Sequence, residues 1–552
     1  MPNVFLRTHA DRRHPVAVAA RAALYGTATI ALIAAMPTSA GADDMTELKV
    51  ELQELLDRME RVEQVQEQSQ VAAEQATGSS YVVNRSIRNR ATKQTDFMTL
   101  QDMYITPQTA QEDGVMGGDF PGSFKLPGSD TSMAIFGFAK ADYIYNFGAK
   151  RAFPFAQLGT FQAIETGAGI TAGGVGDTHG NDGDFNMSVQ TSQVSIMTQT
   201  PSEYGTITTH LKWDFGAINF NEGEGPGAGE ARVANYMELG ARLMYGTIGP
   251  LTFGQTYGAF NNLSNYPETA NHEGPSIPVR RAALLMWADS LGGGWSFAVS
   301  AEQPAQDFVP LSVTAANASA AGGNAVATAV AAIVGTGGAT LANTQRNRMP
   351  EFGGNIRYAQ EWGAVQLGGA VREVAYQLDP SNNALHAGVP QALGGTSGDS
   401  TIGFGVTVQL QLADPIGMGG RDVFNIYGGY GDGHSLYLPD FHFAGFGTAG
   451  LVNPTTGDID TSKNWFTLVW YQHWWTETIR SMAMFGYNGH SPGNDFSAGG
   501  TFQRSTITTA NLFWSPVPRV NLGLEMARIT GHTKSNLDSD AVEMQFTSVF
   551  LF

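Results

Sequence analysis

The sequence predicts an all-β transmembrane barrel of 16 antiparallel strands, preceded by an N-terminal α-helical coiled-coil segment. Three observations support this fold class. Only 15% of the 552 residues are charged and 67 are glycine, whereas soluble proteins carry roughly 25% charged residues. From residue 132 onward, apolar and polar residues alternate with a period of two. Short connections also alternate with long ones between the predicted strands, as in barrels that cross an outer membrane.

The overall charge and the absence of cysteine exclude several classes of function. Lys and Arg number 31 against 50 Asp and Glu, so the formal net charge is −19. An acidic chain lacks the basic surface that neutralises phosphates, which argues against nucleic-acid binding. With no cysteine, the chain has no disulfide scaffold, no thiol nucleophile and no Cys-ligated metal site.

Residues 1–42 have the pattern of an export signal. A basic region precedes an apolar stretch over residues 22–36, and Ala40-Gly41-Ala42 then provides small residues for cleavage before Asp43. The alternative is a membrane anchor, but this apolar stretch is shorter than the ~20 residues that a helical span needs.

Residues 43–77 predict a coiled coil. Apolar residues recur at spacings of three and four, at Met45, Leu48, Leu52, Leu55, Met59 and Val62. Acidic residues outnumber basic ones between them, so much of the negative charge lies outside the barrel. One amphipathic helix lying on its own domain is the alternative. Residues 78–131, rich in Gly, Pro, Gln and Asp near their end, predict a linker.

Residues 132–552 predict the barrel itself. Thr208, His210 and Lys212 alternate with Ile207, Leu211 and Trp213, which gives one polar and one apolar face. The predicted strands begin near residues 132, 186, 204, 231, 250, 278, 294, 349, 362, 400, 421, 463, 478, 503, 519 and 540. Their length suits a membrane-crossing strand of ~9–11 residues better than a soluble sandwich. The final strand ends in Phe552, which looks like the terminal recognition signal of outer-membrane barrels.

Ordered motifs over most of the mature chain resemble the DcaP-like trimeric outer-membrane porins. They are Gly122–Ser132, Pro267–Thr269, Gly274–Pro275, Arg280–Arg281, Trp362–Gly363 with Arg372–Glu373, Gly420–Asp422 before Tyr430–Gly433, Gln472–His473 with Trp475 and Arg480–Ser481, Asn511–Pro516, and Gly523–Glu525. The resemblance implies passive uptake of small anions, often dicarboxylates or aromatic acids, through a homotrimer in the outer membrane. The Ala/Gly-rich stretch 315–342 departs from the family pattern.

The sequence contains no convincing catalytic constellation, so we expect no enzyme, cofactor or bound metal. The segment Gly489-His490-Ser491-Pro492-Gly493 matches the G-x-S-x-G pattern of hydrolases. That motif requires a turn from a strand into a helix, whereas this segment lies in a Gly/Pro loop between two predicted strands. The Asp pairs at 182/184 and 458/460 lack the ligand spacing of a calcium loop and are expected to be solvated.

Strand parity turns a set of basic side chains into the lumen. These are Lys140, Lys212, Arg242, Arg357, Arg372 and, with a weaker pattern, Arg480. The same parity turns Asp142, Asp214, Glu238, Glu525 and Glu543 inward, so the predicted lining is mixed. Any one inward Arg is equally well explained as half of an ordinary ion pair in the lumen.

The long connection 261–279 is the expected constriction, by resemblance to porins of this size. It carries Asn262, Glu268, His272 and Glu273, and it leads into Arg280 and Arg281. Because the planar fork of Arg suits bidentate recognition of carboxylates, we expect Arg280, Arg281, Arg242, Arg357 and Arg372 to form a ladder for anionic solutes.

Two other interpretations remain at this stage. A general unselective or cation-preferring porin is possible because acids are as numerous as bases in the predicted lumen. A structural envelope protein, embedded in outer-membrane lipid and tethered to the cell wall by its coil, would use the barrel only as an anchor. In each case the coil would lie in the periplasm, on the side of the short turns.

Overall fold

The structure is a computed structural model. It describes residues 117–147, 183–217, 238–260, 266–270, 278–304, 308–309, 346–377, 398–415, 421–438, 449–497, 501–534, 536 and 538–552. All of these belong to the second of two compact units, which spans residues 76–552. The predicted signal peptide, the coiled coil at 43–77 and the insertion at 315–342 lie outside the described residues. In the described part, no helix is long and apolar enough to cross a membrane.

The described residues form strands almost throughout. The strands are β1 (Phe124–Lys125), β2 (Ser132–Asn146), β3 (Asp184–Ser188), β4 (Gln193–Thr200), β5 (Ile207–Ala217), β6 (Glu238–Ile248), β7 (Leu251–Tyr257), β8 (Arg281–Gly292), β9 (Trp295–Glu302), β10 (Phe308–Val309), β11 (Glu351–Gln360), β12 (Gly363–Gln377), β13 (Gly398–Ala413), β14 (Val423–Asp432), β15 (Gly450–Val452), β16 (Ile459–Thr461), β17 (Lys463–Trp474), β18 (Ile479–Ser491), β19 (Phe502–Trp514), β20 (Val520–Thr533) and β21 (Asp538–Leu551).

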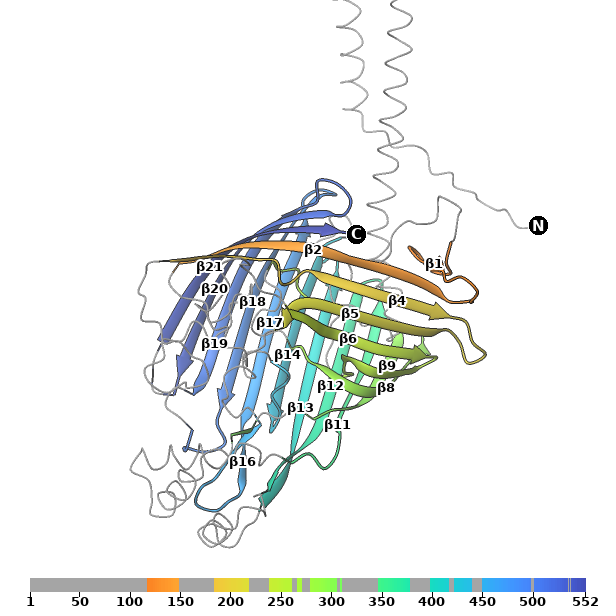
Figure 1. The fold of residues 1–552 in the computed structure, drawn as a ribbon. Helices are drawn as coiled ribbons and strands as arrows, with labels where there is room; N and C mark the ends of the chain where they lie inside the picture. The colour runs from red at the N-terminus through yellow and green to blue at the C-terminus, as the bar shows by residue number, and fades with distance from the viewer. Residues whose placement is uncertain are drawn as a thin grey trace, which may run out of the picture. The chain divides into compact units, whose positions relative to one another are not determined.

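Antiparallel pairing joins all of these strands except β10, β15 and β16, which form a small separate sheet, into a closed barrel (Figure 1). The order around the wall is β2-β4-β5-β6-β7-β8-β9-β11-β12-β13-β14-β17-β18-β19-β20-β21, and β21 pairs back onto β2. At the seam, Gly137 and Phe552 exchange two backbone hydrogen bonds, of 3.2 and 3.0 Å. The predicted 16-stranded antiparallel barrel is therefore confirmed, and its closure leaves no strand edge open to lipid.

Alternation along each strand separates a polar lumen from an apolar outer face. On β13, Val406 and Val408 are 50% and 52% exposed, whereas Thr407 and Gln409, which alternate with them, are buried. The same alternation on β2 buries Lys140 and Asp142 and exposes Tyr143. Exposed apolar side chains on the outside of a barrel form the surface that contacts lipid.

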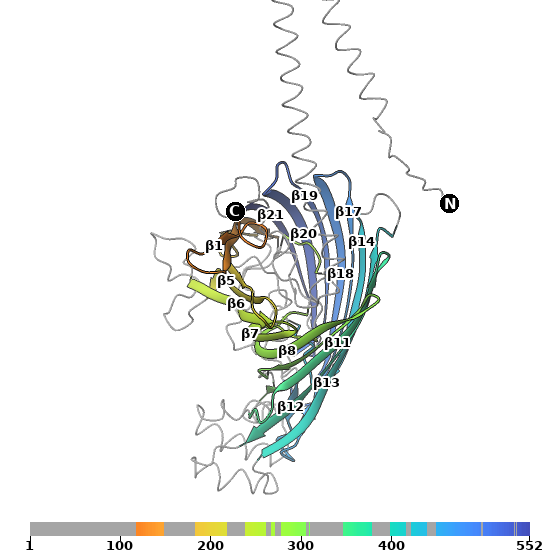
Figure 2. The same cartoon turned by 90° about the vertical axis from the view of Figure 1, so that its right-hand side faces the viewer.

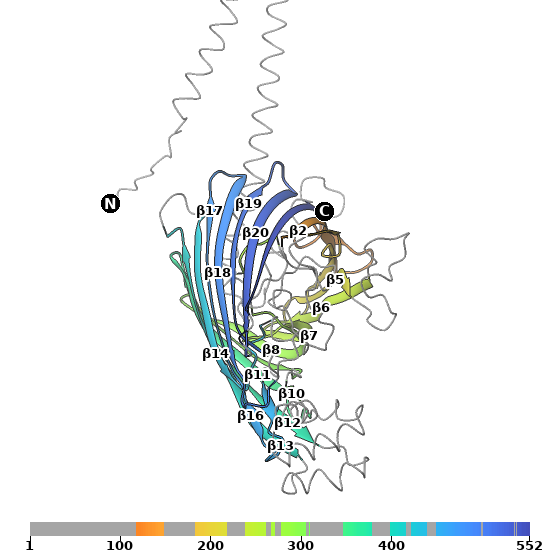
Figure 3. The same cartoon turned by 90° about the vertical axis from the view of Figure 1, so that its left-hand side faces the viewer.

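The connections alternate between short and long as the sequence predicts, except at the last one: residues 534–537, between β20 and β21, are only four residues long, which is the length of the short connection 475–478. The short ones span residues 201–206, 249–250, 293–294, 361–362, 414–422, 475–478 and 515–519. Figures 2 and 3 show β5–β8 and β17–β18 on different sides of the lumen. Each strand start lies within a few residues of its predicted position, except that β6 begins at Glu238 rather than near 231.

Two features of the wall differ from the simple prediction. The strand expected near 186 is divided into β3 and β4, which pair with the two halves of β2. Ser192 stabilises the break, since its hydroxyl donates to Val189 O at 2.7 Å and accepts from Lys140 N–H at 3.0 Å. In addition, the end of the predicted linker is part of the barrel, because Phe124 in β1 pairs with Met133 in β2.

Candidate functional site: the barrel lumen

The connection after β7 enters the lumen along the wall formed by β9 and β11. Ala259 and Phe260 are completely buried. The Ala259 N–H donates to Ser300 Oγ on β9 at 3.0 Å, and Asn355 Nδ2 on β11 donates to Ala259 O. The start of this connection is therefore fixed to the inner face of the barrel and does not extend into the external solvent.

The same connection is next fixed to the opposite wall, through Glu268. The Glu268 carboxylate accepts bonds from Arg480 Nε at 2.7 Å and Arg480 Nη2 at 2.5 Å, and also from Gln472. Asn511 Nδ2 donates to the backbone oxygen of Glu268 at 2.7 Å. This bidentate, fully buried ion pair between loop and wall is the strongest type of polar contact available to an Arg.

Ala270 completes the attachment. Its N–H donates to Glu525 Oε2 on β20 at 2.8 Å, and its carbonyl accepts from Lys140 Nζ on β2 at 2.8 Å. In the order of strands around the wall, β20 lies eight places from β9 in a ring of 16. The described parts of this connection, Ala259–Phe260 and residues 266–270, are therefore fixed to opposite sides of the lumen, and we call them together the crossing loop.

A second segment, after β14, also folds into the lumen and packs against the crossing loop. The exposed fraction is at most 1% for each of five consecutive residues, His434, Ser435, Leu436, Tyr437 and Leu438. Ring contacts at centroid distances of 5.3 and 5.6 Å join Phe260 of the crossing loop to His434 and Tyr437. We call residues 433–438 the inner brace.

Glu351, at the start of β11, ties the inner brace to the wall. Its Oε1 accepts from Tyr437 OH at 2.7 Å and lies 2.8 Å from His434 Nε2, and its Oε2 lies 2.9 Å from Arg280 Nη1. The Leu436 N–H donates to His434 Nδ1 at 2.9 Å, which leaves the ring proton on Nε2, facing Glu351. Burial, with Glu351 beside it, raises the pKa of Tyr437 well above its usual value, so its hydroxyl remains a donor.

Most of the predicted basic residues are held by acids or backbone oxygens. Arg242 pairs with Asp214, Lys140 lies 3.2 Å from Asp142, and Arg480 is held by Glu268. Arg280 is bound to Glu351. Lys212 and Arg372 are buried on the inner face of β5 and β12. These side chains hold the lumen together. Arg280 and Arg372 both interact electrostatically with Glu351, and Lys212 does so with Arg242 and Arg281.

Arg281 is the first residue of β8, and its charge interacts with that of the buried Lys212. Its guanidinium lies 5.7 Å from the ring centroid of Tyr257, and Nη1 donates to the Tyr257 hydroxyl at 3.2 Å. Along β8 it shares the strand parity of the exposed Leu285 and Trp287. Of the predicted loop residues, Glu268 is bound as described, and Asn262, His272 and Glu273 lie outside the described residues.

Arg357 on β11 differs from the other lumenal bases. Its side chain is only 6% exposed, and among the described residues its Nε and Nη1 have no hydrogen-bond partner. It lies two residues beyond Asn355 toward the short-turn end of the strand. Ser296 and Gln366, both buried, are its neighbours on β9 and β12. Because an unpaired buried charge is costly, Arg357 is the lumenal base with the most to gain from an anionic partner.

Neutral polar groups extend from Arg357 around the wall. Gln366 is directly opposite Gln409 on β13, and Gln409 Nε2 lies 3.4 Å from Asn425 Oδ1 on β14. Asn425 is opposite Trp470 on β17. Within the described structure, Asn425 Nδ2 and Trp470 Nε1 are also buried donors without a partner. We call Arg357, Gln366, Gln409, Asn425 and Trp470 the donor row.

Sequence reasoning missed the inner brace and the role of Glu351. The apolar run Leu436-Tyr437-Leu438 inside a long connection was the available signal, because solvated loops seldom carry three large apolar residues in succession.

Comparison with known proteins now identifies the family. The family described as "Porin subfamily" (Porin_2) matches residues 121–532. The chain belongs to this porin subfamily. A search of curated protein sequences found no match.

Several solved porin structures align with the chain. The outer membrane channel DcaP of Acinetobacter baumannii aligns with a TM-score of 0.56 at 16% identity, covering 78% of this chain and 99% of that one. The anion-selective porin from Comamonas acidovorans (TM-score 0.41, 9% identity) covers 76% of this chain and 100% of its own. The trimer form of OmpT from Vibrio cholerae (TM-score 0.42, 7% identity) covers 76% and 99%. The predicted resemblance to DcaP-like porins is confirmed, and the family and the fold are those of an outer-membrane channel.

Proposed function

We propose that this porin passes small anionic solutes, such as dicarboxylates or aromatic acids, and that it works as a homotrimer. The observation that carries the proposal is Arg357. It is a buried cation in the lumen wall whose donors Nε and Nη1 have no partner among the described residues. A carboxylate that loses water beside it gains charge-assisted hydrogen bonds in return.

The rest of the lining is consistent with moderate binding at several points. Arg242, Arg280 and Arg480 are neutralised by acids, so they do not trap a passing anion. The donor row offers further N–H groups beyond Arg357 without adding charge. Conduction requires sites that attract a solute and still release it, and one free cation beside neutral donors meets both conditions.

The mixed lining also favours a second candidate, a general porin with little charge preference. The lumenal acids Asp142, Asp214, Glu268 and Glu525 are buried close to the bases, so the summed charge of the paired groups is small. In that case Arg357 would be satisfied by water, and solute size alone would limit permeation.

Reversal potentials in a planar bilayer under a KCl gradient distinguish these candidates. We expect the wild type to prefer anions and Arg357→Gln to lose most of that preference, while Arg357→Lys retains it. Liposome uptake of succinate or phthalate should fall about tenfold in Arg357→Gln, since a charge-assisted hydrogen bond contributes ~1.5–3 kcal/mol.

The matched control is Lys463→Gln. Lys463 is an exposed base on β17 whose side chain lies on the opposite strand face from the buried Asn464. The Lys463→Gln substitution removes one charge outside the lumen, so the reversal potential of this variant should equal that of the wild type. A wild type that prefers cations, or an Arg357→Gln variant with unchanged selectivity, would replace the proposal with the general porin.

A further inference from the structure

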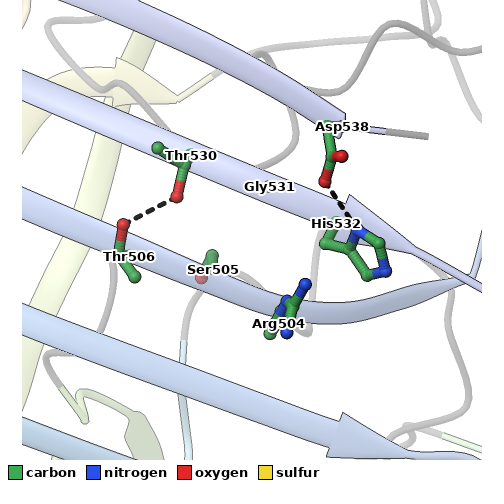
Figure 4. A pocket seen from close by; sticks show the side chains of 7 residues that line it. All are labelled: Arg504, Ser505, Thr506, Thr530, Gly531, His532 and Asp538. Atoms are coloured by element: carbon green, nitrogen blue, oxygen red, sulfur yellow. Dashed lines mark hydrogen bonds and ion pairs between the residues drawn. The ribbon is translucent and has the colours of Figure 1, made fainter. Parts of the chain in front are cut away.

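A pocket that the channel function does not use lies at the long-loop end of β19, β20 and β21. Arg504, Ser505, Thr506, Thr530, Gly531, His532 and Asp538 line it (Figure 4). Its volume is about 420 Å³, within the ~300–1,000 Å³ typical of small-ligand sites. We call it the outer pocket.

Strand parity places Arg504, Thr506, Thr530 and His532 of the outer pocket on the outside of the barrel, whereas Ser505 has the inward parity and is buried. Asn511 on β19 and Glu525 on β20 point into the lumen, since both contact the crossing loop. Arg504 and Thr506 have the opposite parity to Asn511, and Thr530 and His532 have the opposite parity to Glu525. Their surface is therefore the one that meets the membrane and not the channel.

The outward residues of these strands change from apolar to polar along the barrel. Toward the short turns, Leu512, Trp514, Leu524, Met526 and Phe546 are exposed by 40 to 52%. Toward the long loops, the outward positions of β19 and β20 become Thr508, Thr506 and Arg504, and Arg528, Thr530 and His532. Apolar outward residues match the acyl chains and polar ones match the headgroup layer. The outer pocket thus lies at headgroup depth in the outer leaflet.

The chemistry of the outer pocket is that of an anion site. Arg504 is directly opposite His532 in the strand register, and Thr506 is opposite Thr530, with their hydroxyls 2.6 Å apart. Asp538 is the one acid that lines the pocket, and it is paired with His532, whose Nδ1 lies 2.6 Å from its carboxylate. Among the described residues no carboxylate pairs with Arg504, so its five N–H donors are available.

We propose that the outer pocket binds a phosphate group of an anionic lipid headgroup in the outer leaflet. The Arg504 fork matches phosphate geometry bidentately, and the paired hydroxyls of Thr506 and Thr530 offer a further hydrogen bond. A lipid is the occupant because the pocket opens on the membrane side of the wall, at the depth where headgroup phosphates lie. This proposal is independent of the solute that the channel carries.

The test is lipid binding to the full-length protein in detergent micelles, followed by native mass spectrometry. A bisphosphorylated lipid A is compared with the zwitterionic phosphatidylethanolamine. We expect lipid A to bind the wild type more tightly than phosphatidylethanolamine does, and Arg504→Gln to weaken lipid A binding about tenfold. Arg504→Lys should weaken lipid A binding less than Arg504→Gln does. Asp538→Asn should strengthen lipid A binding, because it removes a negative charge beside the phosphate.

Lys463→Gln is the control, because it removes an exposed outward base at the long-loop end of a different strand. Equal lipid A binding by Arg504→Gln and Lys463→Gln would overturn the proposal. Full competition by millimolar inorganic phosphate would also overturn it, in favour of a site for free anions. A variant whose trimer dissociates in lipid-free micelles would show that a second copy of the chain occupies the pocket instead.

Discussion

At the scale of single residues, the lumen contains two kinds of arginine. Arg480 is satisfied by Glu268 through two hydrogen bonds, whereas Arg357 has donors without partners in the described structure. Both lie on the inner face of a strand, and both are buried. The difference arises from the crossing loop, which brings an acid to one of them and not to the other. Arg480 therefore has a structural role, and Arg357 is the stronger candidate for contact with solute.

This division predicts the behaviour of Glu268→Gln. Removing one partner of a buried ion pair costs ~3–5 kcal/mol because the remaining charge is left uncompensated. Since Glu268 belongs to the crossing loop, we expect the loop to detach while the barrel stays folded. Single-channel recordings should show a higher and noisier conductance, and the thermal midpoint in detergent should fall.

The control for this prediction is the double variant Glu268→Gln/Arg480→Gln. Without a buried charge, it should recover part of the lost thermal stability and keep the higher conductance. A Glu268→Gln protein with the conductance and thermal midpoint of the wild type would mean that this ion pair does not hold the crossing loop.

At the scale of elements, the inner brace explains how the crossing loop keeps its position on the side of β11. Leu436 and Tyr437 adopt left-handed backbone conformations, with φ of 56° and 58°, which are unfavourable for residues with large side chains. Two contacts of Tyr437 oppose this strain. Its hydroxyl donates to Glu351, and its carbonyl accepts from Val279 N–H at 2.9 Å, just before Arg280.

We therefore expect Tyr437→Phe to loosen the inner brace. The variant keeps the ring contact with Phe260 and loses a buried hydrogen bond to a carboxylate, worth ~1.5–3 kcal/mol. The measurement is protease cleavage of the folded protein from the long-loop side, together with conductance noise, and both should increase. Tyr430→Phe, an exposed outward Tyr on β14, should change neither. If both variants behave alike, the Tyr437 hydroxyl does not hold the brace.

At the scale of the whole molecule, the sequence predicts the wall far better than the contents of the lumen. Strand positions follow from a period of two that repeats along every strand, so starts such as Ser132, Lys463 and Ile479 could be predicted to within one residue. The contacts inside the lumen have no such period. Glu268 meets Arg480 across 212 residues, and that meeting depends on the closed ring and on the path of a loop.

The same reasoning explains which site residues could be found. Arg357 was predicted because its inward direction depends only on local alternation. The partners of Arg280 and Arg480 could not be predicted, because Glu351 and Glu268 reach them through the barrel closure and the crossing loop. Parity therefore gives the direction of a side chain, and only the tertiary structure shows whether its charge is free.

Assembly is the remaining property at this scale, and its prediction rests on residues 43–76, which lie outside the described part of the chain. If their heptads form a three-stranded coil, its short apolar seam adds only part of the trimer interface, and the apolar outer wall of the barrel supplies the rest. Deleting 43–76 should then lower the temperature at which the trimer dissociates on semi-native gels, while each monomer keeps its heat-modifiable barrel. A full-length variant with Leu52→Gln and Leu55→Gln should show the same loss, since it breaks the seam without shortening the chain. A trimer that dissociates at the wild-type temperature in both variants would show that the barrel wall alone holds the three subunits together.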